Sequence, residues 1–196
     1  MQLFLFPTEV WNFDLEQLDN EKLSEIILEK EKTESSQSLS NVGGWQSKSA
    51  LHYDKGFSRV VDIVKENLST VCSYQNYKKG ITFTLADMWA NVNRYKDSNM
   101  KHLHGRSDWS WVYYVSVPQG SGRIILCDPR IRRTMYYKEE LLQNFDNLSQ
   151  YSEYKIVPSV GKLIMFASYL EHYVEPNLTK LPRISISGNI NGNLGT

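Results

Sequence analysis

Residues 110–127 read SWVYYVSVPQGSGRIILC, and this stretch decides the fold class. Its first half is rich in the β-branched and aromatic residues that favour strands, and it closes at Pro118. The segment QGSG at 119–122 supplies a turn, and Arg123–Cys127 reads as a second strand. The stretch therefore predicts two successive strands joined by a short turn.

Further short strands are predicted on both sides of this pair. They cover residues 81–95, 154–157, 162–166, 172–174 and 183–190. Short strands with Gly and Pro turns, and without alternating helices, favour a sandwich or barrel over a parallel α/β sheet. The count of seven or eight strands predicts a mainly β jelly roll. A short helix or helical turn is also predicted around Leu141, Leu142 and Phe145.

Two helices are predicted before the strands. The first runs through Leu23, Ile26 and Ile27, with Asp19 or Asn20 as its cap. The second spans residues 57–71, where apolar residues recur at spacings of three, four and seven. We therefore expect residues 1–40 to form a helical extension and loop packed on the same domain. Residues 41–196 would form the jelly-roll domain.

Composition limits the class of protein. The 196 residues carry 22 Lys+Arg and 22 Asp+Glu, and 41% are hydrophobic. A net charge of zero argues against a protein that holds nucleic acid by bulk charge. No run approaches the roughly 18 apolar residues of a membrane helix, and two cysteines are too few for a disulfide framework. A cytoplasmic protein without a membrane partner is predicted, and the sequence does not indicate its oligomeric state.

Three of the four histidines lie in the strand-rich part of the chain. His102 and His104 would project to the same side of an extended segment, because strand side chains alternate with period two. His172 could supply a third imidazole if the fold brings the strands together. Neutral imidazole is a common ligand for iron, zinc, copper and nickel. A loop sequence follows His104 directly, so the pair would lie at the mouth of the barrel.

A second unusual feature follows His172 in the chain. Arg183, Ser185 and Ser187 would share one face of a strand. An arginine on the inward face of a barrel is costly unless it is paired with an anion. Its partner would be an internal Asp or Glu, or the carboxylate of a ligand, which a guanidinium binds in bidentate fashion.

These residues together resemble the 2-oxoglutarate- and Fe(II)-dependent oxygenases. A closer resemblance is to an oxygenase subgroup found in marine bacteria and their phages. The resemblance covers roughly residues 41–191, with the ordered segments GGWQS at 43–47, MWANVN at 88–93, HLHGRS at 102–107, DPR at 128–130, LEHYV at 170–174 and RISIS at 183–187.

The resemblance implies a fold, a set of cofactors and a reaction. The fold would be a double-stranded β-helix, a jelly roll with helices packed outside. The cofactors would be Fe(II), 2-oxoglutarate as co-substrate, and O2. The protein would be a dioxygenase that hydroxylates an unknown small-molecule or protein substrate and releases succinate and CO2, in the host cytoplasm if it is phage-encoded.

The resemblance also implies the site residues. The metal ligands would be His102, His104 and His172. The residues that bind 2-oxoglutarate would be Arg183, Ser185, Tyr113 or Tyr114, and Asn91.

Two departures from the family pattern concern the site. Most members have Asp or Glu at the position of His104, so Asp108, four residues later, is a possible additional ligand. Trp111 stands where the subgroup usually has Gly, and its ring would either narrow the substrate entrance or pack outside.

Two alternatives remain open at this point. His-x-His followed by an acid also resembles the cupin pattern, which indicates a metalloenzyme that does not use 2-oxoglutarate. A non-catalytic jelly-roll binding or structural protein is the other alternative. Arg183 and Ser185 favour the oxygenase, because a cupin site does not need them.

Overall fold

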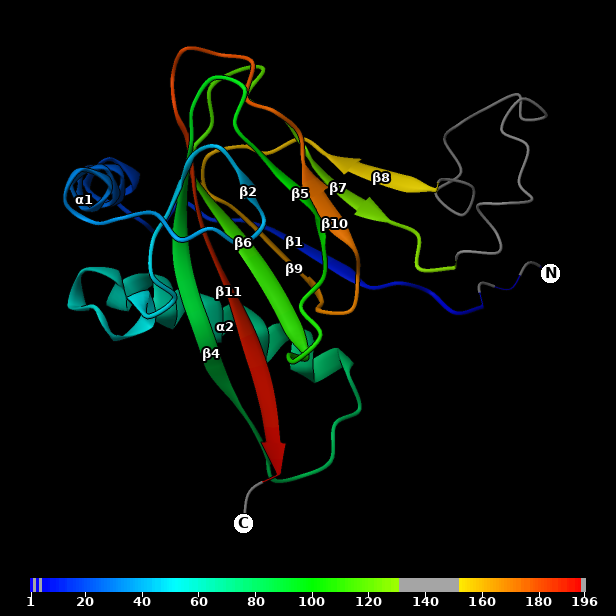
Figure 1. Ribbon diagram of the computed structural model, residues 1–196. Coiled ribbons are helices and arrows are strands. Elements are labelled where there is room, and N and C mark those ends of the chain that lie inside the picture. The colour runs from blue at the N-terminus through cyan, green and yellow to red at the C-terminus, as the bar shows by residue number, and fades with distance from the viewer. Residues whose placement is uncertain (2, 4, 131–151, 195–196) are drawn as a thin grey trace, which may run out of the picture.

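The computed structural model describes residues 1, 3, 5–130 and 152–194. Their strands form two antiparallel sheets that face each other (Figure 1). Sheet A has the spatial order β1 (Val10–Asp14), β9 (Lys162–Ala167), β6 (Trp109–Ser116), β11 (Arg183–Leu194), β4 (Ile81–Asn93) and β3 (Trp45–Gln46). Sheet B has the order β2 (Asn41–Val42), β5 (Ser98–His102), β10 (His172–Val174), β7 (Ile124–Cys127) and β8 (Glu153–Ile156). This arrangement confirms the predicted jelly roll.

Sheet A separates two hydrophobic cores. One core fills the space between its outer face and the two helices, and includes Ile27, Val64, Ala90 and Ile186. The other lies between the two sheets and is built around residues of β6, β7 and β9. Side chains alternate along each strand of sheet A, so one face of the sheet packs against the helices and the opposite face points toward sheet B. The face toward sheet B is the one on which a site can form.

The two helices match their predictions. Helix α1 (Asn20–Thr33) begins after Asp19, whose side chain accepts a hydrogen bond from the backbone N–H of Lys22 at 3.0 Å. It buries Leu23 and Ile27. Helix α2 (Ser58–Tyr74) buries one stripe of residues at the predicted spacing: Val60, Ile63, Val64, Leu68 and Val71. The 3₁₀ turns Leu51–Tyr53 and Lys55–Phe57 lead into α2.

Trp111 packs in the outer core, on the side of sheet A that faces the helices, and it also lines the pocket between the two sheets. Its side chain is 1% exposed. The indole lies over Gly188, where a Cβ atom would come within 2.8 Å of Cζ2 of the ring. The large side chain on β6 is therefore accommodated by the missing side chain on β11.

The N-terminal residues contribute more than the sequence predicted. Strand β1 pairs with β9 over five residues and forms one edge of sheet A. Its sequence, VWNFD, is too short and too mixed to stand out as a strand. The helix predicted around Leu141, Leu142 and Phe145 lies outside the described residues. In the part of the chain that the structure describes, no helix is long and apolar enough to cross a membrane.

Candidate metal and co-substrate site

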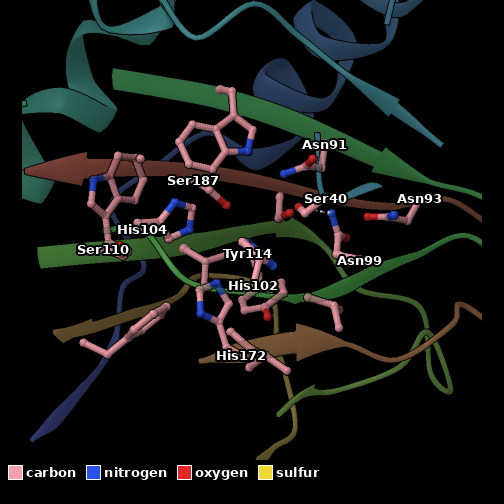
Figure 2. A pocket seen from close by; sticks show the side chains of 18 of the residues that line it. Ser40, Asn91, Asn93, Asn99, His102, His104, Ser110, Tyr114, His172 and Ser187 are labelled. Carbon is pink, nitrogen blue, oxygen red and sulfur yellow. Dashed lines mark hydrogen bonds between the residues drawn. The ribbon is translucent and has the colours of Figure 1, made fainter. Parts of the chain in front are cut away.

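Three histidines meet at one end of the barrel. His102 ends β5, His104 follows it in the loop, and His172 begins β10. His102 and His172 are paired across the two neighbouring strands. One ring nitrogen from each of the three histidines lies within 4.8 Å of those of the other two. Figure 2 shows the three side chains directed toward the same space.

The orientation of two of these rings is set by backbone carbonyls. Nδ1 of His102 lies 2.7 Å from the carbonyl oxygen of Met100, and Nδ1 of His172 lies 2.9 Å from that of Leu170. A carbonyl oxygen can only accept, so Nδ1 carries the hydrogen in both residues. Nε2 is then left with its lone pair free, as a metal ligand requires.

Burial keeps the imidazoles neutral. It lowers the pKa of His102, lowers that of His104 to about 4 and lowers that of His172 to about 3. Repulsion from a protonated His102 would lower the pKa values of His104 and His172 further. At neutral pH the group offers three uncharged nitrogen donors, a set that suits iron, zinc, copper or nickel.

The structure does not bring Asp108 to this group. Its side chain is exposed, and Oδ2 accepts a hydrogen bond from the backbone N–H of Gly192 at 2.7 Å. The cluster found among the described residues contains three histidines and no carboxylate. The geometry therefore does not support Asp108 as an additional ligand.

Arg183 is the second element of the site. It begins β11 and is 1% exposed. Nη1 donates to the carbonyl oxygens of Ser121 and Glu175, the latter at 3.2 Å. Nη2 is buried and has no hydrogen-bond partner. Burial lowers the pKa of Arg183, but an arginine stays charged at neutral pH.

The Glu175 carboxylate does not neutralise Arg183. Both oxygens of Glu175 are bound by Arg123, at 2.8 Å from Nε and 2.8 Å from Nη2. Gly122 lets this turn approach closely, because a Cβ atom there would come within 2.5 Å of the Glu175 carbonyl oxygen. An internal Asp or Glu was one predicted partner for Arg183, and the described residues contain no such ion pair. The unpaired Nη2 is thus available to an anionic ligand.

Arg183 and the histidines line one pocket between the two sheets. Ser185, Asn91 and Tyr114 line it as well. Ser185 is paired with both Asn91 and Tyr114, so three adjacent strands present these side chains together. Oδ1 of Asn91 is buried and has no hydrogen-bond partner. Burial raises the pKa of Tyr114 to about 12, so its phenol remains a hydrogen-bond donor.

Tyr113 lies on the other face of β6. Its hydroxyl donates to Oδ1 of Asn20 at 2.8 Å, and its ring belongs to the outer core. The sequence left Tyr113 and Tyr114 as alternatives, and the structure places only Tyr114 in the pocket.

Several other pocket residues were not predicted as site residues. They include Ser40, Trp89, Asn99, Ser110 and Phe166. Asn99 faces inward after an irregularity in the pairing of β5 with β10, so strict alternation from His102 would not find it. Ser40 comes from the loop before β2 and accepts a hydrogen bond from the Asn99 amide at 3.3 Å.

Comparison with known families identifies the class of protein. A family profile described as "Putative 2OG-Fe(II) oxygenase" matches residues 87–189, just over half of the chain. The chain therefore belongs to the 2OG-Fe(II) oxygenase family. The marine and phage subgroup and the cytoplasmic location stay predictions. A comparison with curated protein sequences found no match.

Solved structures share the fold at low sequence identity. A prolyl-4-hydroxylase from Pseudomonas putida is 13% identical, with a TM-score of 0.63 over 94% of this chain and 92% of that one. HygX from Streptomyces hygroscopicus, solved with nickel and 2-oxoglutarate bound, is 8% identical, with a TM-score of 0.60 over 94% and 83%. The α-ketoglutarate-dependent epimerase SnoN of nogalamycin biosynthesis is 12% identical, with a TM-score of 0.64 over 96% and 79%. These neighbours confirm the double-stranded β-helix.

Proposed function

We propose that this oxygenase is a hydroxylase that binds Fe(II) through His102, His104 and His172 and anchors 2-oxoglutarate on Arg183. The observation that carries this assignment is the buried, unpaired Nη2 of Arg183, which belongs to the same pocket as the three histidines. A buried guanidinium N–H without a partner costs about 1–3 kcal/mol or more. The distal carboxylate of 2-oxoglutarate would remove that cost.

The residues present fit both the metal and the co-substrate. Three neutral nitrogens, two of them with their tautomers set by backbone carbonyls, are a donor set for Fe(II). When bound, Fe(II) with 2-oxoglutarate and O2 supplies the oxidation of a substrate C–H bond, with release of succinate and CO2.

The remaining pocket residues hold and orient the co-substrate in this proposal. Ser185 and Tyr114 add hydroxyl donors beside the Arg183 guanidinium. Asn91 offers the co-substrate a hydrogen-bond acceptor, its unpartnered amide oxygen, and the N–H donors of the same amide. Ile124 and Val174 complete the same wall and exclude water around the co-substrate chain.

Hydroxylation is favoured over epimerisation by the chemistry of the pocket lining. Epimerisation needs a side chain that returns a hydrogen to the opposite face of the substrate. The described lining residues include no cysteine, and Tyr114 is their only tyrosine. Since the buried Tyr114 interacts with the charge of Arg183, it is assigned to the co-substrate. Hydroxylation requires only that the protein position a substrate C–H bond beside the metal. The substrate is proposed to be a small molecule or a protein.

The decisive experiment is an anaerobic titration of the protein with Fe(II) and then 2-oxoglutarate. A visible charge-transfer band is expected only when both are present, followed by succinate formation on admission of O2. A cupin-type enzyme would bind the metal without developing the band, and a non-catalytic jelly roll would do neither. Either result would refute the proposal.

Tyr114 and Tyr113 provide a matched test of the co-substrate wall. Tyr114→Phe removes one hydrogen bond to a charged ligand and is expected to weaken 2-oxoglutarate binding about 10-fold or more. Tyr113→Phe removes the bond to Asn20 and is expected to lower the free energy of unfolding by about 1 kcal/mol, with unchanged 2-oxoglutarate affinity. Anaerobic titration and thermal melting measure the two effects. Equal losses of affinity in both variants would contradict the assignment.

A further inference from the structure

The pocket has two ends with different side chains. Figure 2 shows Asn91 and Asn99 at one end and His104 and Ser187 at the other. Asn91 is paired with Ser185 across β4 and β11, so the first end is the one assigned to 2-oxoglutarate. The end that contains His104 and Ser187 is therefore left for the substrate.

Trp89 belongs to this second end, because it is paired with Ser187 across the same two strands. The centroid of its ring lies 5.8 Å from that of the His104 ring, at an interplanar angle of 44°. The other four tryptophans of the chain all pack in the outer core. Trp89 packs in neither of the cores that the described residues form, and it is half-buried in the pocket lining. Its indole face is therefore available to a ligand.

Two polar groups at this end have no hydrogen-bond partner in the part of the chain that the structure describes. One is the Nε1–H of Trp89, whereas the same group of Trp109 donates to the hydroxyl of Tyr77 at 2.9 Å. The other is the hydroxyl of Ser187, whereas that of Ser110 donates to a buried amide oxygen at 2.7 Å. A ligand at this end would meet one aromatic face and two free hydrogen-bonding groups.

The charge of the pocket limits what can lie on Trp89. Arg183 is the only charged side chain among the described lining residues, and it is assigned to the co-substrate. A cation on the indole would be repelled by Arg183 and by a bound metal, with no acid in that lining to pair with it. The face of an indole carries a negative potential, which disfavours an anion. An uncharged ring avoids both penalties, and its slightly positive C–H bonds suit the indole face.

We propose that Trp89 is the surface on which the substrate binds, and that it holds an uncharged ring whose hydroxyl or similar polar substituent is bound by Ser187. The inference rests on the proposed function, because the metal held by His104 and its partners makes this end the reacting end. The ring lies beside His104, so the C–H bond that is hydroxylated belongs to the ring or to a carbon attached to it.

The test measures the binding of four small probes by isothermal titration calorimetry under nitrogen. Cyclohexanol has the ring and the hydroxyl. Cyclohexanecarboxylate and cyclohexylammonium have the same ring with a charge, and hexan-1-ol has the hydroxyl without a ring. Each probe is titrated into the protein before and after addition of Fe(II) and 2-oxoglutarate. Binding that Trp89→Leu weakens is assigned to this end of the pocket, which separates it from binding of the carboxylate to Arg183.

Trp89→Leu keeps an apolar side chain but removes the aromatic face. It is expected to weaken cyclohexanol binding about 10-fold and to change the binding of the other three probes by less than about 2-fold. Its melting temperature is expected to stay within about 2 °C of the wild type, since Trp89 packs in neither core. Ser187→Ala is expected to weaken cyclohexanol binding by about 2–10-fold.

Trp11→Leu is the matched control for the same substitution. Trp11 packs on the outer side of sheet A, with its ring 5.1 Å from that of Tyr74. The variant is expected to melt at a lower temperature and to bind cyclohexanol as the wild type does.

The outcomes separate this proposal from the proposed function. Equal losses of cyclohexanol affinity in Trp89→Leu and Trp11→Leu would overturn it. So would the absence of cyclohexanol binding, or a charged probe whose binding depends more strongly on Trp89. A protein that binds cyclohexanol on Trp89 but develops no charge-transfer band would keep this binding surface and refute the proposed function.

Discussion

Replacing Arg183 by alanine is expected to weaken 2-oxoglutarate binding by about 30-fold or more while leaving Fe(II) binding intact. The guanidinium is 1% exposed and its Nη2 has no partner in the protein. Removing one member of a buried, hydrogen-bonded charge pair costs about 2–5 kcal/mol, which corresponds to a factor of roughly 30 to several thousand. Arg183 contacts none of the three histidines through a hydrogen bond, so the metal ligands keep their orientation.

Anaerobic titration measures the two affinities separately. Fe(II) alone gives the metal affinity, and growth of the charge-transfer band gives that of 2-oxoglutarate. Arg183→Lys is expected to recover only part of the loss, because an ammonium cannot form the bidentate pair. Arg94→Ala, which removes an exposed guanidinium paired with Glu31, is the control. Unchanged 2-oxoglutarate affinity in Arg183→Ala would refute the assignment of this residue.

The central part of the site could be predicted because it follows strand periodicity. Arg183 and Ser185 share a face of β11, as alternation requires, and both line the pocket. His-x-His at the end of a strand likewise brings two imidazoles to one place. These residues depend only on local geometry once a β-sheet is assumed.

Other features depend on register, which a single sequence does not specify. Tyr113 and Tyr114 are adjacent, so one of them had to face inward, but the choice is set by pairing with β11 across an irregularity between Ile184 and Ser185. Asn99 is turned inward by a similar shift beside His172. Bulges move a side chain to the opposite face without leaving a clear mark in the sequence.

The neighbours of His104 could not be predicted for a different reason. Asp87 and Asn189 are 102 positions apart and meet only because β4 and β11 are neighbours in sheet A. Asp108 looked like the better acidic partner because it is close to His104 in the sequence. The turn between them instead directs Asp108 toward Gly192. Proximity along the chain was a poor guide to which acid lies near the site.

His172→Ala is expected to abolish metal binding, with a loss of more than about 100-fold in Fe(II) affinity. Losing an outer partner of a ligand already costs about 10–100-fold, and a direct ligand contributes more. His172 is 5% exposed and lies on a strand paired with both β5 and β7. Substitution by a smaller side chain therefore removes the nitrogen donor without changing the strand pairing.

The pattern across variants distinguishes loss of the metal from loss of the co-substrate. Arg183→Ala should bind Fe(II) without developing the charge-transfer band, whereas His172→Ala should do neither, because 2-oxoglutarate needs the metal as its second anchor. His52→Ala is the control, since His52 lies outside the pocket lining and should bind both. Isothermal titration with Fe(II) under nitrogen measures the affinities. Retained Fe(II) binding in His172→Ala would mean that the metal is held by other residues, and the three-histidine assignment would be wrong.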